Sequence, residues 1–149
     1  MQVGEGSKEE MTAEKIKNDA PASDLSLPRP SFREAISRAE RQVEYEVICY
    51  DCPSDGALAH ELCAIIAEVY MMNPAGPIRI SGEWLDGYVV QQVFAELTYN
   101  HVCTVIEEFK RLTIDVRNKK AYLRTSLYNS VFTMNAHYTN RINYDLARG

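Results

Sequence analysis

The sequence predicts an all-α fold, a compact bundle of five or six helices behind an N-terminal tail. Apolar residues recur at helical spacing in successive segments from residue 31 onward, and short connections join the segments. Residues 1–30 instead mix Lys, Glu, Ser, Asn, Ala and Pro with scattered apolar positions, which is typical of a tail or linker. The predicted domain is therefore residues 31–149.

Composition narrows the class of protein. With 149 residues and 46% hydrophobic content, one domain with a substantial core is expected. No apolar run approaches the roughly 18 residues of a transmembrane helix, and the acidic N-terminus lacks the apolar segment of a signal peptide, so we expect a soluble cytoplasmic protein without membrane contact. The four cysteines look like small buried hydrophobes, and disulfides are not expected.

The charge is distributed unevenly along the chain. From Lys110 to the end there are eight Lys and Arg against two acids, whereas the rest of the chain carries a net charge of −11. Such a dipolar protein can present a basic surface to an acidic partner or a phosphate backbone despite a total charge of −5. An incidental distribution of solvated charge explains it equally well.

The first two helices follow from periodicity and stop signals. The first is predicted from Ser31 to about Tyr50, although alternation at Tyr45, Val47 and Cys49 also fits a strand. The second follows Pro53, with Ser54 and Asp55 as capping candidates, and ends before Asn73–Pro77. Their predicted buried residues are Phe32, Ile36, Ala39, Val43 and Val47 in the first helix, and Leu58, Leu62, Ile65, Ile66 and Val69 in the second.

Four more helices are expected after a short extended segment at Ile78–Ile80, whose candidate partner strand is Tyr45–Cys49. Ser81 is the predicted cap of the third helix, and the fourth begins at Thr98. The fifth spans about Val116 to Val131, and the sixth follows Thr133. Their predicted buried residues are Leu85, Val89, Val93 and Leu97; Tyr99, Val102, Cys103, Ile106 and Phe109; Val116, Leu123 and Leu127; and Met134, Tyr138 and Ile142.

Little in the sequence points to catalysis. Cys49 and Cys52, followed by His60 and Cys63, could hold zinc, but ordinary buried thiols explain them as well. His101 and Cys103 are two residues apart on a helix, so they do not form a base and nucleophile pair. No phosphate loop, nucleophile elbow or metalloprotease helix is present. We therefore expect a protein that is not an enzyme, with no catalytic residue and no cofactor.

The fifth helix carries the most informative charges. Arg117, Lys120, Arg124 and Tyr128 recur at spacings of three and four and form one stripe, with Lys119 beside it. Such a stripe could hold phosphates, with Tyr128 stacking on an unpaired base. The alternative is a solvated helix face whose aliphatic stems cover the core. These five residues, Arg117, Lys119, Lys120, Arg124 and Tyr128, are the candidate contacts for DNA or a partner.

A set of short motifs runs in order along the chain from about Glu44 to Leu146. They are Ile78-Arg-Ile-Ser-Gly82, Val89-Val90, His101 with the following Val-x-x-Val-Ile pattern, Asp115-Val-Arg-Asn118, Lys120-Ala-Tyr-Leu123, Leu127-Tyr-Asn129, Thr133-Met134, Tyr138-Thr139 and Asn143-x-Asp-Leu146. With these motifs the chain resembles the C-terminal domain of RepA-type replication initiators of plasmids and integrative conjugative elements in Gram-positive bacteria. A more distant resemblance is to the helical C-terminal module of DnaD-type primosome proteins.

Several positions depart from these families. Asp86 and Val131 stand where prolines are expected, Gln91 replaces a lysine and Tyr144 a histidine. The DnaD-type signature Tyr-x-x-x-Ile-x-x-x-Trp, placed on Tyr122, meets two serines, Ser126 and Ser130.

The resemblance implies a replication-accessory domain of a mobile-element initiator, which recruits host replication proteins such as primase or a helicase-loading factor. It leaves DNA contact and a homo-oligomer open. Two alternatives remain beside it, namely a nucleic-acid-binding domain that uses the basic helix, and a small zinc-stabilised structural domain.

Overall fold

The computed structural model describes the backbone of residues 28–148 and the side chains of residues 28–135. The predicted tail up to residue 27, and the predicted inward side chains Tyr138 and Ile142, lie outside this range. Within it the all-α prediction is confirmed, with one small two-stranded sheet. The elements are α3 (Phe32–Gln42), α4 (Tyr45–Asp51), the 3-10 turn η1 (Pro53–Asp55), α5 (Gly56–Met71), β1 (Pro77–Ile80), β2 (Glu83–Asp86), α6 (Gly87–Phe94), α7 (Tyr99–Lys110) and α8 (Lys119–Arg148).

The first predicted helix is two helices. Ser31 and Glu34 form a reciprocal capping box at the start of α3, as the sequence Ser-x-x-Glu favours. The chain then breaks at Glu44, which adopts a left-handed conformation with φ 57°. Val47, which follows the break and was predicted to be buried, is 42% exposed. In the first turn of α3, Phe32 was also predicted to be buried but is 47% exposed, and Ala35 takes the core position there instead.

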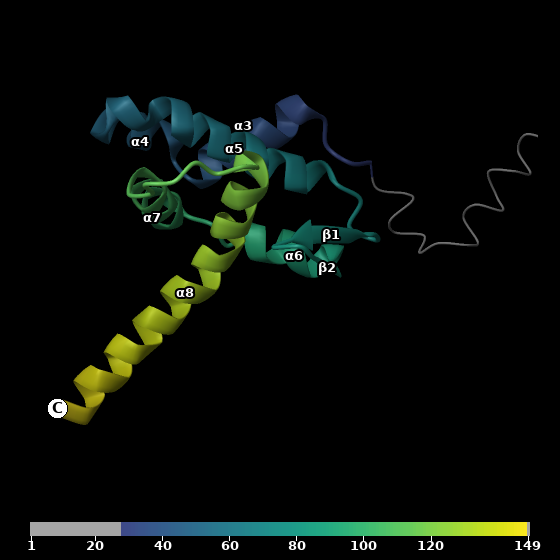
Figure 1. Cartoon of the computed structure of the whole chain (residues 1–149). Coiled ribbons are helices and arrows are strands. Elements are labelled where there is room, and N and C mark those ends of the chain that lie inside the picture. The colour runs from purple at the N-terminus through teal and green to yellow at the C-terminus, as the bar shows by residue number, and fades with distance from the viewer. Residues whose placement is uncertain (1–27, 149) are drawn as a thin grey trace, which may run out of the picture.

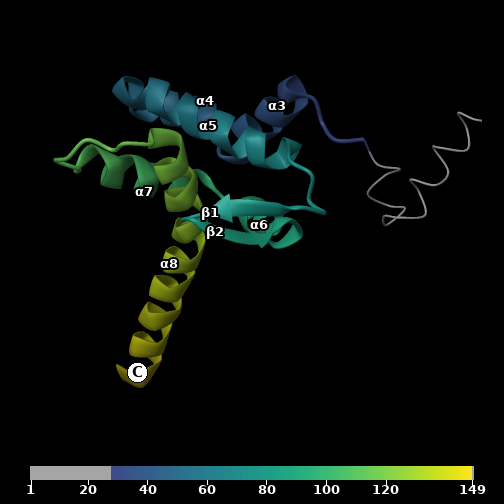
Figure 2. The same ribbon diagram turned by 45° about the vertical axis from the view of Figure 1, so that its right-hand side comes forward.

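Helix α5 is the centre of the domain. Four residues of its predicted stripe, Leu62, Ile65, Ile66 and Val69, are buried as expected, and the fifth, Leu58, is half-buried against the same core. It packs against α3, α4, α6, α7 and α8, and these helices surround it in Figures 1 and 2. Asp55 precedes the helix as predicted, but its carboxylate accepts from Lys110 Nζ at 3.0 Å and caps no backbone N–H of α5.

Two glutamines cap partly buried helix ends. Gln91 Nε2 donates to the carbonyls of Val69 and Met72 at the end of α5, at 2.9 and 3.0 Å. Gln42 Nε2 donates to the carbonyls of Phe94 and Leu97 at the end of α6, both at 2.9 Å. The last carbonyls of a helix have no partner within the helix, so these side chains supply the missing donors and fix α6 against α3 and α5.

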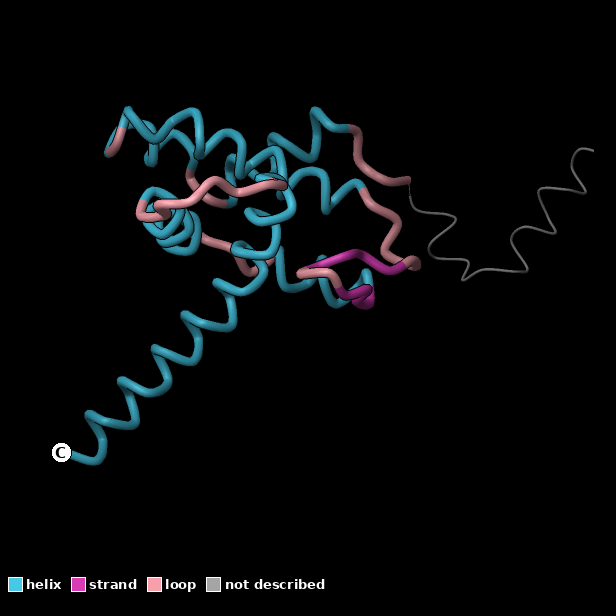
Figure 3. The backbone as a smooth tube through the Cα atoms, in the orientation of Figure 1, coloured by secondary structure: helices cyan, strands magenta, loops and turns pink. Residues whose placement is uncertain are grey.

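The extended segment pairs with its own continuation. β1 and β2 are adjacent antiparallel strands, drawn in magenta in Figure 3. Arg79 lies opposite Trp84 and Ile80 opposite Glu83, and the connecting residues Ser81 and Gly82 have positive φ. The predicted partner Tyr45–Cys49 is helical, and the predicted helix start at Ser81 is wrong. Asp86 is the cap of α6, since its Oδ1 accepts from the N–H groups of Tyr88 and Val89 at 2.8 and 3.4 Å.

The fifth and sixth predicted helices form one helix, α8. No Gly or Pro occurs from Lys119 to Arg148, so nothing in the sequence interrupts the backbone ladder. Leu123 and Leu127 are buried as predicted, whereas Val116 lies in the preceding loop and is only half-buried. Beyond the body of the domain α8 extends away as a straight rod, which both ribbon views show (Figures 1 and 2).

Among the described residues, no helix is both long enough and apolar enough to cross a bilayer.

Gly87 fixes the joint between the hairpin and α6. A Cβ at this position would lie 2.6 Å from the carbonyl oxygen of Pro74 and would also clash with that of Gly76. We expect Gly87→Ala to lower the free energy of unfolding by about 1–3 kcal/mol, because backbone atoms cannot yield as a side-chain tip would. Urea denaturation measures this change.

The control is Gly56→Ala, because Gly56 has helical φ and ψ at the start of α5 and a Cβ there would contact only Cys49 Sγ, at 3.4 Å. We expect its stability to be unchanged or raised by up to about 1 kcal/mol. Equal stabilities for the two variants would contradict the steric argument.

Candidate interaction face

The predicted basic stripe lies across α5. Lys119, Lys120 and Arg124 occupy the first two turns of α8, and their ends meet two carboxylates on one face of α5. Lys119 Nζ lies 3.0 Å from Glu61 Oε1, and Lys120 Nζ lies 3.0 Å from Glu68 Oε2. Arg124 Nη2 lies 3.9 Å from Glu68 Oε1. The structure thus brings three predicted cations onto two acids of the same chain.

These ion pairs have a local electrostatic cause. Lys119 and Lys120 stand at the N-terminus of α8, where the helix dipole is positive and disfavours cations. Glu61 and Glu68 offset this, although each exposed pair stabilises the fold by no more than about 1 kcal/mol. Arg124 is held further, since its guanidinium also donates to the Arg79 carbonyl at 3.4 Å and its side chain is only 17% exposed. The arrangement matches the alternative of a solvated, core-covering face.

The other two stripe residues are placed differently. Arg117 lies in the loop before α8, so its predicted position on the helix is wrong; it is exposed and has no ion pair among the described residues. Tyr128 is half-buried, and its ring packs against Phe132 with centroids 5.2 Å apart. The five candidate residues therefore do not form one open cationic surface.

The four zinc candidates do not form one cluster among the described residues. Cys63 is fully buried in the core, while Cys52 and Cys103 line a separate small cavity of about 30 Å³ with Asp51 and Asp55. Burial raises the pKa of the Cys63 thiol to about 12, which disfavours the thiolate that zinc requires. Within residues 28–135 no group of three or more His, Cys, Asp or Glu is placed to hold a metal ion. The geometry gives the zinc alternative no support.

His101 has a structural task at the start of α7. Its Nδ1 accepts from the Thr98 backbone N–H at 3.0 Å and lies 2.8 Å from Thr98 Oγ1, so the pair forms a capping box with histidine in the place usually taken by Glu or Gln. The ring is 8% exposed, and burial lowers its pKa. Cys103 has no part in this cap.

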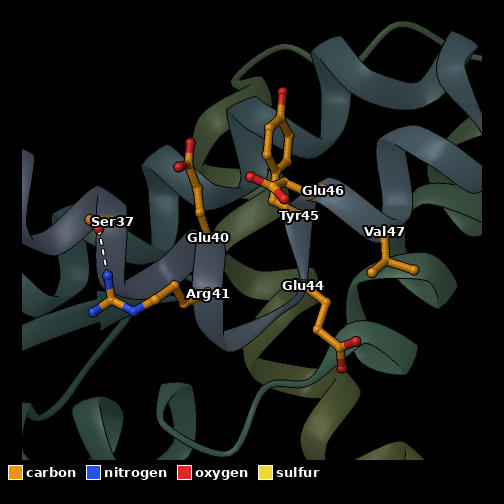
Figure 4. A pocket seen from close by; sticks show the side chains of 7 residues that line it. All are labelled: Ser37, Glu40, Arg41, Glu44, Tyr45, Glu46 and Val47. Atoms are coloured by element: carbon orange, nitrogen blue, oxygen red, sulfur yellow. Dashed lines mark hydrogen bonds between the residues drawn. The ribbon is translucent and has the colours of Figure 1, made fainter.

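An acidic concavity of about 470 Å³ lies at the break between α3 and α4. Glu40, Glu44 and Glu46 line it, with Arg41 turned toward Ser37 Oγ at 2.7 Å (Figure 4). Figure 4 shows the carboxylates of Glu40 and Glu44 on opposite sides of the chain. Because these groups do not point to a common position, they make no acid–base pair for catalysis.

The most distinctive exposed surface is on the hairpin. Ile78 and Ile80 face the core, which leaves Arg79 and Trp84 together on the outer side. Trp84 is 62% exposed, and the Arg79 guanidinium lies 5.2 Å from its ring centroid. The first turn of α6 follows directly and exposes 46% of both Tyr88 and Val89. We call Arg79, Trp84, Tyr88 and Val89 the hairpin face.

Sequence reasoning missed the hairpin face because Glu83–Asp86 had been assigned to a helix. A signal existed, since Ser81-Gly82 is a turn dipeptide between two segments that contain apolar residues. With the hairpin in place, Trp84 and Arg79 become cross-strand neighbours, which no helical assignment would have suggested.

Comparison with known proteins identifies the family. The family model described as "Family of unknown function (DUF6017)" matches residues 13–149. The chain belongs to this family. No curated protein and no solved structure matches it.

The DUF6017 match covers the hairpin face, the ion-paired start of α8 and all described helices. It begins at residue 13, before the domain boundary predicted at residue 31. The family description assigns no activity, so any functional argument rests on the geometry above and on the resemblance drawn from the sequence.

The cap formed by His101 predicts a pH dependence of stability. Because the folded-state pKa of His101 is lowered from 6.5, the unfolded chain binds more protons than the folded one as the pH falls below this value. This contribution to stability is complete well above pH 6.5 and is lost progressively as the pH falls toward the folded-state pKa.

His101→Gln keeps the capping box but replaces histidine with glutamine, a side chain that does not titrate. Urea denaturation across this pH range should show a smaller decline for His101→Gln than for the unmodified chain, with His60→Gln as the control. Superimposable profiles for His101→Gln and the unmodified chain would contradict the assignment.

Proposed function

We propose that the chain is a non-catalytic accessory domain of a mobile-element replication initiator, which works in the cytoplasm and recruits a host replication protein such as primase or a helicase-loading factor. The role comes from the resemblance to RepA-type initiators. The observation that supports protein recruitment is the hairpin face, where the only tryptophan of the chain is exposed beside an arginine.

The composition of this face supports protein binding. Residues that dominate binding energy at protein interfaces are most often Trp, Tyr and Arg. Exposed apolar surface also costs free energy in water, which a partner removes by covering it. Trp84, Tyr88 and Val89 stand on a hydrogen-bonded hairpin and a capped helix start, so a partner would order little backbone on binding.

The basic stripe supports the same preference. A protein that binds DNA through phosphates uses cations that are free to replace counterions. Lys119, Lys120 and Arg124 already have carboxylate partners at 3.0–3.9 Å. Self-association, which the resemblance leaves open, stays a prediction.

Recruitment through the hairpin face predicts a large effect of Trp84→Ala. Purified chain would be titrated against purified primase and helicase-loading factor from a Gram-positive host by biolayer interferometry. We expect at least one of the two to bind, and Trp84→Ala to weaken binding by about 30-fold or more, as for an interface residue worth at least about 2 kcal/mol.

Tyr50→Ala is the matched control, because Tyr50 is 86% exposed on α4, an element that contributes no residue to the hairpin face. Circular dichroism would check that both variants fold. Absence of binding to either protein would refute recruitment, and equal losses for Trp84→Ala and Tyr50→Ala would refute the assigned face.

A second candidate function is direct DNA contact at the start of α8. It is favoured by Arg117, which lies next to the stripe in sequence and is exposed. Among the described residues, Arg117 has no ion pair. If DNA binds here, Glu61 and Glu68 compete with phosphate for the cations. We expect Glu61→Gln with Glu68→Gln to strengthen binding of labelled DNA, and Arg117→Ala with Lys120→Ala and Arg124→Ala to weaken it.

Fluorescence anisotropy with single-stranded and double-stranded DNA, at low and near-physiological salt, measures both changes. Binding that weakens with salt and follows this order of variants would establish contact at α8. No binding at low salt, even by the Glu61→Gln, Glu68→Gln variant, would exclude it.

A further inference from the structure

A second concave site lies next to the hairpin face and shares Tyr88 with it. It has a volume of about 260 Å³. It is formed by residues 28–30, which precede α3, together with α3, the end of α5 and the start of α6. Its lining includes two arginines, Arg29 and Arg38, and no acidic residue. Such a charge balance differs from that of the α8 stripe, where carboxylates accompany the cations.

The two arginines are uncompensated. In the part of the chain that the structure describes, no carboxylate oxygen lies within 4.0 Å of either guanidinium. The Arg38 guanidinium instead stacks over the Tyr70 ring, 3.8 Å from its centroid. A stacked guanidinium keeps its in-plane N–H groups available, and these can donate two parallel hydrogen bonds to one carboxylate.

Arg38 is held in place before any ligand arrives. Tyr70, on which Arg38 stacks, is 5% exposed, and its hydroxyl donates to Gln42 Oε1 at 2.5 Å. Arg29 is exposed, and the proline that follows it restricts its backbone to extended conformations. The stacked Arg38 therefore loses little conformational entropy when an anion binds, which favours affinity.

The lining also indicates which anion fits. Phosphate groups are most often held by backbone N–H groups at helix N-termini or in glycine-rich nests. The backbone groups fixed at this site are instead carbonyls, those of Val69 and Met72, which Gln91 already caps. The lining also includes Met72, Pro74 and the rings of Tyr70 and Tyr88, which suit an apolar side chain beside an acidic one.

The surroundings argue against a nucleic acid strand. Glu83 and Asp86 are exposed on the neighbouring strand β2, so a polyanion running across the hairpin would meet carboxylates. A single acidic side chain entering the pocket would not. We propose that this pocket binds a carboxylate side chain in an acidic peptide segment of the partner, with an adjoining apolar residue packed on the pocket lining or on Trp84. This inference rests on the proposed recruitment function and names its partner's chemistry.

The probe is a short labelled peptide of alternating glutamate and phenylalanine, titrated against the full chain by fluorescence anisotropy. A matched peptide with glutamine for glutamate tests the need for charge. We expect the glutamate peptide to bind and the glutamine peptide to bind at least about tenfold more weakly, as the loss of a hydrogen-bonded charge implies. Arg38→Gln should weaken glutamate peptide binding by a similar factor, and Arg29→Gln should weaken it too.

Arg33→Gln is the matched control, since Arg33 is exposed on the same helix as Arg38, lies outside the pocket lining and makes the same change in net charge. Arg29→Gln is a second test that does not depend on effects on folding, because Arg29 is exposed and precedes α3. Three outcomes would overturn the inference: equal binding of the two peptides, an equal loss with Arg33→Gln, or a single-stranded oligonucleotide that displaces the peptide with the same dependence on Arg38.

The outcome also separates this inference from the recruitment proposal. If the glutamate peptide does not bind but the replication protein still binds in a Trp84-dependent way, only the carboxylate-binding role of the pocket is refuted. If the peptide binds in an Arg38-dependent way but neither primase nor helicase-loading factor binds, the pocket's role is supported and the proposed partner is refuted.

Discussion

The burial of α5 is the constraint on which the rest of the domain depends. The sides of α5 are covered by five other helices, and its last carbonyls lie where water reaches them only in part. Gln91 reaches back from α6 to supply the donors, and Gln42 does the same for the end of α6. These polar contacts fix α6 against α3 and α5. Because β2 leads directly into α6, the hairpin that exposes Trp84 adjoins this fixed helix.

Charge pairing between α5 and α8 explains how the uneven charge of the chain is used. The acidic residues Glu61 and Glu68 form the one strongly charged edge of α5, and the start of α8 places Lys119, Lys120 and Arg124 on it. Complementary charge within the chain aligns α8, while Leu123 and Leu127 provide the apolar burial that stabilises its docking. The net charge of a segment therefore gives little information about its partners until the internal pairs are known.

Apolar periodicity correctly predicted helices that bury one regular apolar stripe. It missed the elements whose conformation is fixed by tertiary contacts. Helices α5 and α7 follow from regular stripes and clear stops. The break at Glu44 does not, because a left-handed glutamate is an unfavourable local choice that packing of α3 and α4 on α5 imposes. The hairpin was not predicted because the spacing of Leu85 and Val89 fits one helical stripe. The same spacing also fits a strand followed by the start of a helix. The sequence could indicate the cations of the candidate site but not their carboxylate partners, which lie more than fifty positions away.

Magnitudes decide between the two surfaces that the chain offers. Each exposed ion pair on the α8 stripe is worth no more than about 1 kcal/mol, so a polyanion could displace Glu61 and Glu68, yet it would gain only the difference between two similar interactions. A tryptophan covered by a partner contributes about 2 kcal/mol or more. Arg38, in the pocket that shares Tyr88 with the hairpin face, is stacked on Tyr70 and adds a directional charged contact without first breaking an internal ion pair. Exposed apolar area and an arginine without a carboxylate partner thus favour a protein partner over a phosphate backbone.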